Sequence, residues 1–286
     1  MKVSGFTFIK NGVILGYPFL ESILSVLPIV DEFIINVGDS EDDTLEQLKS
    51  IKNKKVKIIQ SSWNDTMRDK GYVYGQQKMI AQFNCTGDWL FYVEGDEVYH
   101  EDDLANIRAS MEEFQNNPKV EALAVSFYHF YGNQNTYLDS PGWYRSEARI
   151  LKNNIRTYAP DGLFWLVLKS NKVGRYPNAK EINAHCYHYG WIRNEQQMQL
   201  KSDKVHKYWN TSKPALIDYS QIDSKILKEF TGAHPKIMLQ KFGKDKSVFK
   251  ADPNYRISKK ERKHRVMNFF EKKFNLNLSK RHYKKI

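Results

Sequence analysis

The sequence has very little cysteine: only Cys85 and Cys186 occur among its 286 residues. Two cysteines so far apart do not form the disulfide framework of small secreted proteins, so we expect a reducing compartment. Hydrophobic residues make up 41% of the chain. This share, at this length, supports a hydrophobic core and excludes an intrinsically disordered protein.

Long uninterrupted hydrophobic runs are also absent. The most apolar stretch, residues 17–37, is interrupted by Glu21, Pro28 and Glu32, which excludes a membrane-spanning helix there. The first strand-like segment reaches Lys10 too early to be the core of a signal peptide. We therefore expect a cytoplasmic protein, with peripheral contact at the inner face of the membrane as its only membrane association.

Positive charge is concentrated at one end of the chain. The formal net charge is +11, yet residues 234–286 alone hold 17 Lys and Arg against 4 Asp and Glu, a net charge of +13. The other 233 residues hold 27 basic and 29 acidic side chains, a net charge of −2. The body and the basic tail are therefore expected to have different partners.

Short apolar runs alternate with helix-like segments through the first half of the chain. This order is typical of an α/β fold in which a mainly parallel, mixed sheet is flanked by helices. Ligands of such sheets bind beyond the carboxyl ends of the strands. We expect strands at residues 3–9, 33–37, 56–60, 89–93, 122–130 and 164–168, and helices at 18–27, 43–51, 72–83, 102–115 and 195–208.

The strand at 89–93 runs directly into three carboxylates, Glu94, Asp96 and Glu97, and Gly95 permits a tight turn between them. Clustered carboxylates repel one another, and a divalent cation such as Mg2+ or Mn2+ relieves that repulsion. Such a cation also bridges to a diphosphate and neutralises the charge of a departing group. The alternative is a solvated acidic turn that opens the following helix.

This arrangement resembles the family 2 inverting glycosyltransferases of the GT-A fold, in which a strand ends in an Asp-x-Asp-type motif. The resemblance is good over residues 3–104, fair to residue 191 and absent in the tail. It implies a nucleoside-diphosphate sugar as donor and a GT-A (Rossmann-like) architecture. The implied divisions are a GT-A domain at 1–233, with a nucleotide-sugar-binding half at 1–104 and an acceptor half at 105–233, and a basic helical C-terminal extension at 234–286.

The same resemblance implies roles for individual residues. Asp96 matches the main metal contact, with Glu97 and the late His188 beside it. The alternative for His188 is a hydrogen-bonded histidine in an aromatic core. Asp39 matches the residue that reads the base or ribose, and its alternative is a helix cap. The residues expected to bind the nucleotide-sugar are Phe6, Thr7, Asn11, Asp39, Arg68, Lys70, Gln77, Glu94 and Gly95.

An inverting transferase needs a carboxylate that takes the proton of the acceptor hydroxyl. Two candidates are Asp161, in the loop before the apolar run 163–168, and Glu147, between Arg145 and Arg149. We favour Asp161, because Glu147 has the alternative of an ion pair with either arginine. The expected acceptor is the hydroxyl of a glycan or of a lipid-linked glycan.

The tail contains a helical pattern of its own at residues 258–275. Val266, Met267, Phe270 and Phe274 fall on one face, and lysines and arginines crowd the rest. Such a helix suits an anionic membrane surface, and the alternative is a helix packed on the body with solvated lysines. Nucleic acid is not an expected partner, because the body carries no recognisable nucleic-acid-binding module.

The sequence thus predicts a metal-assisted, inverting glycosyltransferase. Two other functions stay open. A nucleotidyltransferase that makes nucleotide-sugars would need a glycine-rich basic loop after the first strand, which residues 8–12 match poorly. A non-catalytic protein would bind polyanions through the basic tail.

Overall fold

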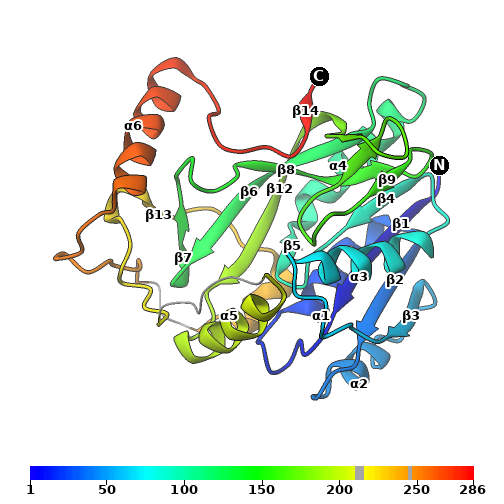
Figure 1. Ribbon diagram of the computed structural model, residues 1–286, viewed down its shortest axis with the longest axis horizontal. Helices are drawn as coiled ribbons and strands as arrows, with labels where there is room; N and C mark the ends of the chain where they lie inside the picture. The colour runs from blue at the N-terminus through cyan, green and yellow to red at the C-terminus, as the bar shows by residue number, and fades with distance from the viewer. Residues whose placement is uncertain (210–215, 244–246) are drawn as a thin grey trace.

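The computed structural model describes residues 1–209, 216–243 and 247–286. Figure 1 shows one large, twisted sheet with helices packed against it, so the expected α/β fold is confirmed. Within the described residues, no helix combines the length and the apolar character that crossing a bilayer requires.

Four strands form the parallel part of the sheet: β1 (Val3–Ile9), β2 (Glu32–Gly38), β3 (Val56–Ser61) and β4 (Trp89–Tyr92). They lie in the order β3-β2-β1-β4, and each neighbouring pair is parallel. Because parallel strands end at the same edge, the residues that follow β1, β2 and β4 lie side by side. This edge is where the sequence places its polar strand ends.

The helices that alternate with these strands and follow the last of them match the expected segments. They are α1 (Phe19–Val26), α2 (Thr44–Lys49), α3 (Tyr72–Phe83) and α4 (Leu104–Phe114). The segment expected as one helix from residue 102 begins instead as a short 3-10 turn, Glu101–Asp103, because the His100 side chain accepts a hydrogen bond from the Asp102 backbone.

The second half of the chain adds a mixed part to the same sheet. Strand β5 (Glu97–Tyr99) directly follows the acidic turn and pairs antiparallel with β12 (Asn178–Trp191), with Glu97 opposite His188. This register brings the late histidine to the acidic strand end. The remaining strands of the large sheet are β6 (Ala122–Tyr131), β7 (Asn133–Leu138), β8 (Ser146–Lys152), β13 (Leu227–Glu229) and β14 (Lys284–Lys285).

A second, three-stranded sheet holds the loop that carries Asp161. Its strands are β9 (Thr157–Tyr158), β10 (Leu166–Leu168) and β11 (Gly174–Arg175). Helix α3 packs directly on this loop: a Cβ atom at Gly75 would lie 2.3 Å from the carbonyl oxygen of Ala159. Glycine is therefore needed at this point for the helix and the loop to meet.

Hydrophobic clusters lie on both faces of the parallel strands. One cluster packs α1 and α4 against strand residues such as Phe33 and Phe91. The other packs α3 against Phe6, Ile34 and Tyr92 on the opposite face. Strands covered on both sides are continuously apolar, which is why these segments were recognisable in the sequence.

The basic tail is joined to the body along its length, from the packing of Met238 near its start to a strand at its end. Helix α6 (Lys259–Phe274) lies at one edge of the molecule, and the C-terminal strand β14 pairs in parallel with β12. The last strand, β14, belongs to the same sheet as the first ones. The predicted domain boundary at residue 233 stays a prediction.

Candidate functional site

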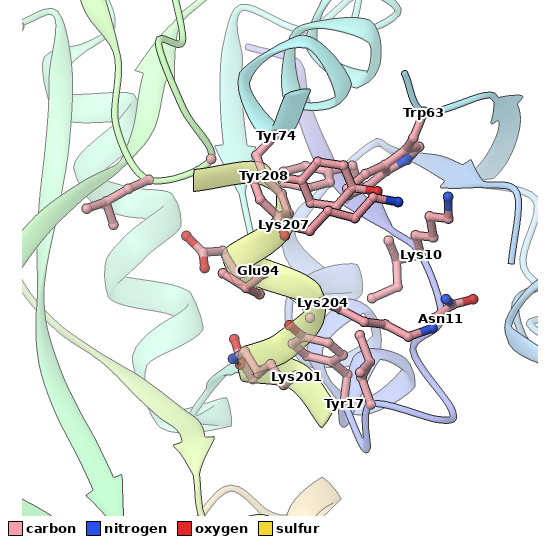
Figure 2. A pocket seen from close by; sticks show the side chains of 18 of the residues that line it. Lys10, Asn11, Tyr17, Trp63, Tyr74, Glu94, Lys201, Lys204, Lys207 and Tyr208 are labelled. Atoms are coloured by element: carbon pink, nitrogen blue, oxygen red, sulfur yellow. Dashed lines mark hydrogen bonds and ion pairs between the residues drawn. The ribbon is translucent and has the colours of Figure 1, made fainter. Parts of the chain in front are cut away.

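A cavity of about 400 Å³ opens at the carboxyl ends of β1 and β4. Residues following these two strands form its floor, among them Asn11, Glu94 and Asp96. Helix α5 (Glu195–Trp209), expected from the sequence at nearly the same residues, crosses its mouth (Figure 2). The cavity therefore lies where ligands of open α/β sheets bind.

Arg149, on β8, is fully buried beneath the acidic strand end. Its Nε lies 3.0 Å from both carboxylate oxygens of Glu97, and its Nη2 lies 2.6 Å from Glu97 Oε1 and 3.2 Å from Glu94 Oε1. Its Nη1 donates to the carbonyl oxygen of Leu163 at 3.1 Å. Burial alone would lower the pKa of Arg149, but the two glutamates hold that pKa well above its usual value. One guanidinium thus fixes both the strand end and the loop after Asp161.

Glu94 is the member of this group that opens onto the cavity, with 29% of its side chain exposed. Burial, together with the Glu97 carboxylate, raises the pKa of Glu94 to about 8, against the opposing effect of Arg149. Glu94 therefore carries a proton at neutral pH in this structure. Glu97, by contrast, is fully buried and does not line the cavity.

A second buried cation, Lys78 of α3, lies behind the same floor. Its Nζ donates to the carbonyl oxygen of Gly162 at 2.9 Å and lies 3.3 Å from the ring centroid of Trp165. Burial and the nearby Arg149 charge lower the pKa of Lys78 well below its usual value. Arg149 and Lys78 thus each hold one carbonyl of the loop that follows Asp161.

Asp96 is compensated by a different set of cations. Its Oδ2 accepts hydrogen bonds from Arg193 Nη2 and from Lys201 Nζ, both at 3.0 Å. Burial alone would raise the pKa of Asp96, but Lys201 and Arg193 hold that pKa well below its usual range. The sequence-based argument that these carboxylates need a metal ion to be tolerated is therefore corrected: side chains of the protein itself neutralise them.

A chain of hydrogen bonds sets the protonation of His188. Nε2 of His129 lies 2.8 Å from the carbonyl oxygen of Tyr144, so this nitrogen must be the one that carries the proton. Its Nδ1 then accepts from Nδ1–H of His188 at 3.0 Å, which leaves Nε2 of His188 with a lone pair. Burial lowers the pKa of both imidazoles, that of His129 to about 4, so both are neutral at pH 7.

The free nitrogen of His188 faces an oxygen of Asp96. His188 Nε2 and Asp96 Oδ1 lie 3.7 Å apart, and both are acceptors. Two acceptors in this arrangement suit a shared cation. Across residues 1–209, 216–243 and 247–286, no group of three or more His, Cys, Asp or Glu side chains is arranged to hold a metal ion. The donor set therefore fits a cation held by two protein ligands, with phosphate or water supplying the others.

A row of lysines projects from α5 into the cavity (Figure 2). Lys201, Lys204 and Lys207 are spaced by three residues and so lie on one face of the helix. Lys204 pairs with Glu41 at 3.1 Å and Lys207 with Asp65 at 2.8 Å. This row was not predicted from the sequence, although its spacing within a predicted helix was a usable signal.

Aromatic rings form the wall next to this row. Trp63, Tyr74 and Tyr208 are in mutual contact, with ring centroids between 5.3 and 5.6 Å apart. All three line the cavity together with Phe8, whose ring lies 6.0 Å from that of Trp63. The hydroxyl of Tyr208 donates to Asp65 Oδ1 at 2.6 Å, which ties the end of α5 to the loop after β3.

The structure brings part of the predicted set together and places the rest elsewhere. On the cavity wall are Asn11, Glu94, Gly95, Asp96 and His188. Buried away from the cavity are Phe6, Thr7, Gln77, Glu97 and Glu147, and exposed outside its lining are Asp39, Arg68 and Lys70.

The two candidate bases have different surroundings. Glu147 is fully buried; its Oε1 accepts from the backbone of Ala148 and its Oε2 lies 2.6 Å from Nδ1 of His282. Asp161 lies beside the cavity, since the next two residues, Gly162 and Leu163, line it. Its Oδ1 accepts from the Leu163 backbone at 2.8 Å. Among the described residues, its Oδ2 has no hydrogen-bond partner.

Comparison with known proteins places this geometry in a family. Residues 25–174, just over half of the chain, match the family described as glycosyltransferase like family 2. The chain belongs to this family. Its mixed sheet flanked by helices is the GT-A type of fold expected from the sequence.

Individual relatives are distant. An uncharacterized glycosyltransferase, RT0209, from Rickettsia typhi is 26% identical over 204 residues. These residues make up 68% of this chain and 62% of the relative. The chain therefore spans less than two thirds of that relative's length. The solved structure of TarS from S. aureus is 14% identical, with 72% of this chain and 39% of TarS covered and a TM-score of 0.39. Glucosyl-3-phosphoglycerate synthase from Mycobacterium tuberculosis, solved with Mn2+ and UDP, is 14% identical over 46% of this chain and 45% of its own, with a TM-score of 0.32.

The raised pKa of Glu94 predicts a stability that falls with rising pH. Between the pKa of an unfolded glutamate, about 4.5, and the folded value of about 8, the folded state binds more protons than the unfolded state, so its stability decreases. Glu94→Gln removes this loss. We compare the free energy of unfolding of Glu94→Gln with that of wild type at each pH. This difference should shift in favour of the variant by about 1 to 3 kcal/mol from pH 5 to pH 8.

Urea denaturation at both pH values measures this difference. The control is Glu113→Gln, a substitution of an exposed glutamate on α4. An equal offset between Glu94→Gln and wild type at pH 5 and pH 8 would contradict the assignment.

Proposed function

We propose that the protein transfers a sugar from a nucleoside diphosphate to an acceptor hydroxyl. The observation that carries this proposal is the cavity itself, which joins an acidic strand end, a row of lysines and an aromatic wall at the carboxyl edge of the sheet. Each part suits one portion of a nucleoside-diphosphate sugar. Membership in the glycosyltransferase-like family 2 supports the same conclusion.

The lysines of α5 suit the diphosphate of the donor. Lys204 and Lys207 now pair with exposed or half-exposed carboxylates, Glu41 and Asp65, which a phosphate replaces at little cost. Lys10 enters the cavity from the other side and lies 5.5 Å from the ring centroid of Trp63. Flat aromatic rings next to cations suit a nucleotide base.

The reaction breaks the bond between the anomeric carbon and the diphosphate oxygen, and the electron pair leaves with the diphosphate. The acceptor oxygen forms the new bond to the same carbon and gives up its proton. We assign that proton to Asp161, because its Oδ1 is held by the loop backbone while its Oδ2 is available. Attack from the side opposite the leaving group would invert the stereochemistry, as the sequence analysis expects.

Asp96 and His188 are the residues that would hold Mg2+ or Mn2+, through Oδ1 and Nε2 respectively. The ion would supply positive charge for the diphosphate as it leaves. In the proposed site, Lys201 and Arg193 hold the other oxygen of Asp96 and so fix the direction in which Oδ1 points.

The acceptor proposed is a glycan or a lipid-linked glycan, and the location proposed is the cytoplasm. The acceptor follows from the sequence-based resemblance, and the location follows from the low cysteine content, which is typical of a reducing compartment.

A panel of UDP-, GDP-, ADP- and CDP-sugars tests the proposed reaction through hydrolysis of the donor, with and without EDTA. We expect one donor to be hydrolysed to the nucleoside diphosphate, and we expect EDTA to slow the reaction. If instead nucleoside triphosphate and sugar phosphate yielded pyrophosphate while every donor stayed intact, the protein would be a nucleotidyltransferase and the proposal would fail.

The lysine row predicts a specific loss of nucleotide affinity. Lys204→Ala and Lys207→Ala should each weaken binding of the preferred nucleoside diphosphate by about tenfold, because each removes a charge-assisted contact to phosphate. Calorimetric titration measures the dissociation constants. Lys54→Ala, at an exposed turn, is the charge-matched control. Unchanged affinity in both α5 variants would show that the diphosphate does not bind on this side of the cavity.

The two candidate bases are separated by substitutions that keep their shape. Asp161→Asn should lower kcat by at least about a hundredfold and leave donor affinity within about twofold, since the base acts only on the acceptor. Glu147→Gln should leave kcat within a few-fold, because its carboxylate is sealed from the cavity. The reverse pattern, with only Glu147→Gln inactive, would reassign the base.

A further inference from the structure

Helix α6 is attached to the body through its polar side. Arg265 binds Asp223 through two hydrogen bonds of 2.6 Å, and Glu271 accepts from Arg145 at 2.7 Å. Asn268 donates to the carbonyl oxygen of Asp139 at 3.1 Å. Glu271 is the one buried residue in the span of α6. The side of the helix that faces the protein is therefore ionic, the reverse of an ordinary surface helix.

The opposite side of α6, here called the outer face, carries its aromatic residues. Val266, Phe269, Phe270 and Phe274 are exposed by 57%, 59%, 44% and 55% respectively. The rings contact one another, with the centroids of Phe270 and Phe274 5.9 Å apart. In the described part of the chain, none of these side chains belongs to a hydrophobic cluster of the body.

The outer face is also strongly basic. By helical spacing, Lys259, Arg262, Lys263 and Lys273 fall on this face; the first three precede its phenylalanines and Lys273 lies among them. Within the described residues, no ion pair neutralises these four side chains. Lys273 Nζ lies 5.8 and 5.6 Å from the ring centroids of Phe269 and Phe274. Leu276 and Leu278 continue the exposed apolar surface past the end of the helix.

The geometry points to an anionic lipid bilayer as the partner of the outer face of α6. A row of rings flanked by lysines is suited to the boundary between lipid headgroups and acyl chains, where the rings enter and the cations meet phosphate. Helix α6 is about 24 Å long and stands at an edge of the molecule, so it can lie flat on a surface (Figure 1). This inference does not depend on the proposed transferase activity.

Two other partners fit the outer face less well. A second copy of the chain would bring two clusters of unpaired lysines and arginines together, which is unfavourable. A nucleic acid would use the cations but would leave much of the exposed phenylalanine and valine surface without a function, and the body has a net charge of −2. The bilayer alone uses both features.

The test is co-sedimentation of the full chain with phosphatidylcholine vesicles that contain or lack phosphatidylglycerol. Wild type should bind the anionic vesicles at least about tenfold more tightly than the neutral ones. Phe270→Ala/Phe274→Ala and Lys259→Glu/Lys263→Glu should each weaken that binding by about tenfold or more. Phe83→Ala and Lys52→Glu/Lys54→Glu are matched controls, because these exposed residues lie on α3 and in the turn before β3, away from α6.

The outcomes separate the partners. The thermal melting temperature of each variant checks that the fold is kept, since the substituted side chains are exposed. Equal binding to both vesicle types, or full binding by Phe270→Ala/Phe274→Ala, overturns the inference. Two other results also overturn the inference. In the first, wild type forms a dimer that Phe270→Ala/Phe274→Ala does not form, and wild type binds no vesicles. In the second, RNA fully displaces wild type from the vesicles, and Phe270→Ala/Phe274→Ala still binds RNA.

Discussion

The buried guanidinium of Arg149 is the interaction on which the candidate site depends. It contacts Glu94 and Glu97 in the acidic turn between β4 and β5 and also the carbonyl of Leu163, so it joins this turn to the loop that follows Asp161. Removing one member of a buried ion pair typically costs about 3 to 5 kcal/mol, because the remaining charge is left without compensation. The donor side and the proposed base are therefore held in one arrangement by a single side chain.

A second set of charges positions helix α5. Asp96 accepts from Lys201 of α5 and from Arg193, just before the helix, so the acidic strand end also determines where this helix crosses the cavity. At the other end of α5, Tyr208 and Lys207 bind Asp65. The helix is thus fixed at both ends by carboxylates, and its lysines face the space between them. The protein neutralises its own acidic cluster and still leaves cations available for a phosphate ligand.

The sequence predicted the elements of the fold better than the directions of the side chains. The first four strands and their helices were recognisable because apolar runs and helical spacing depend on neighbours in the chain. The acidic turn at Glu94 and Asp96 was recognisable for the same reason. The role of Arg149 was not, since it depends on the pairing of β8 with β4. Nor could spacing show that Glu97 points to that arginine, or that α6 turns its phenylalanines away from the body.

The cavity under α5 is proposed to receive the diphosphate of a sugar nucleotide. A crystal structure of the protein soaked with its preferred nucleoside diphosphate tests this most directly. We expect the diphosphate to lie between the lysines of α5 and the strand end at Glu94 and Asp96, with the base against Trp63, Tyr74 or Tyr208. A nucleotide bound outside this cavity, or a cavity still empty of nucleotide at saturating concentration, would contradict it.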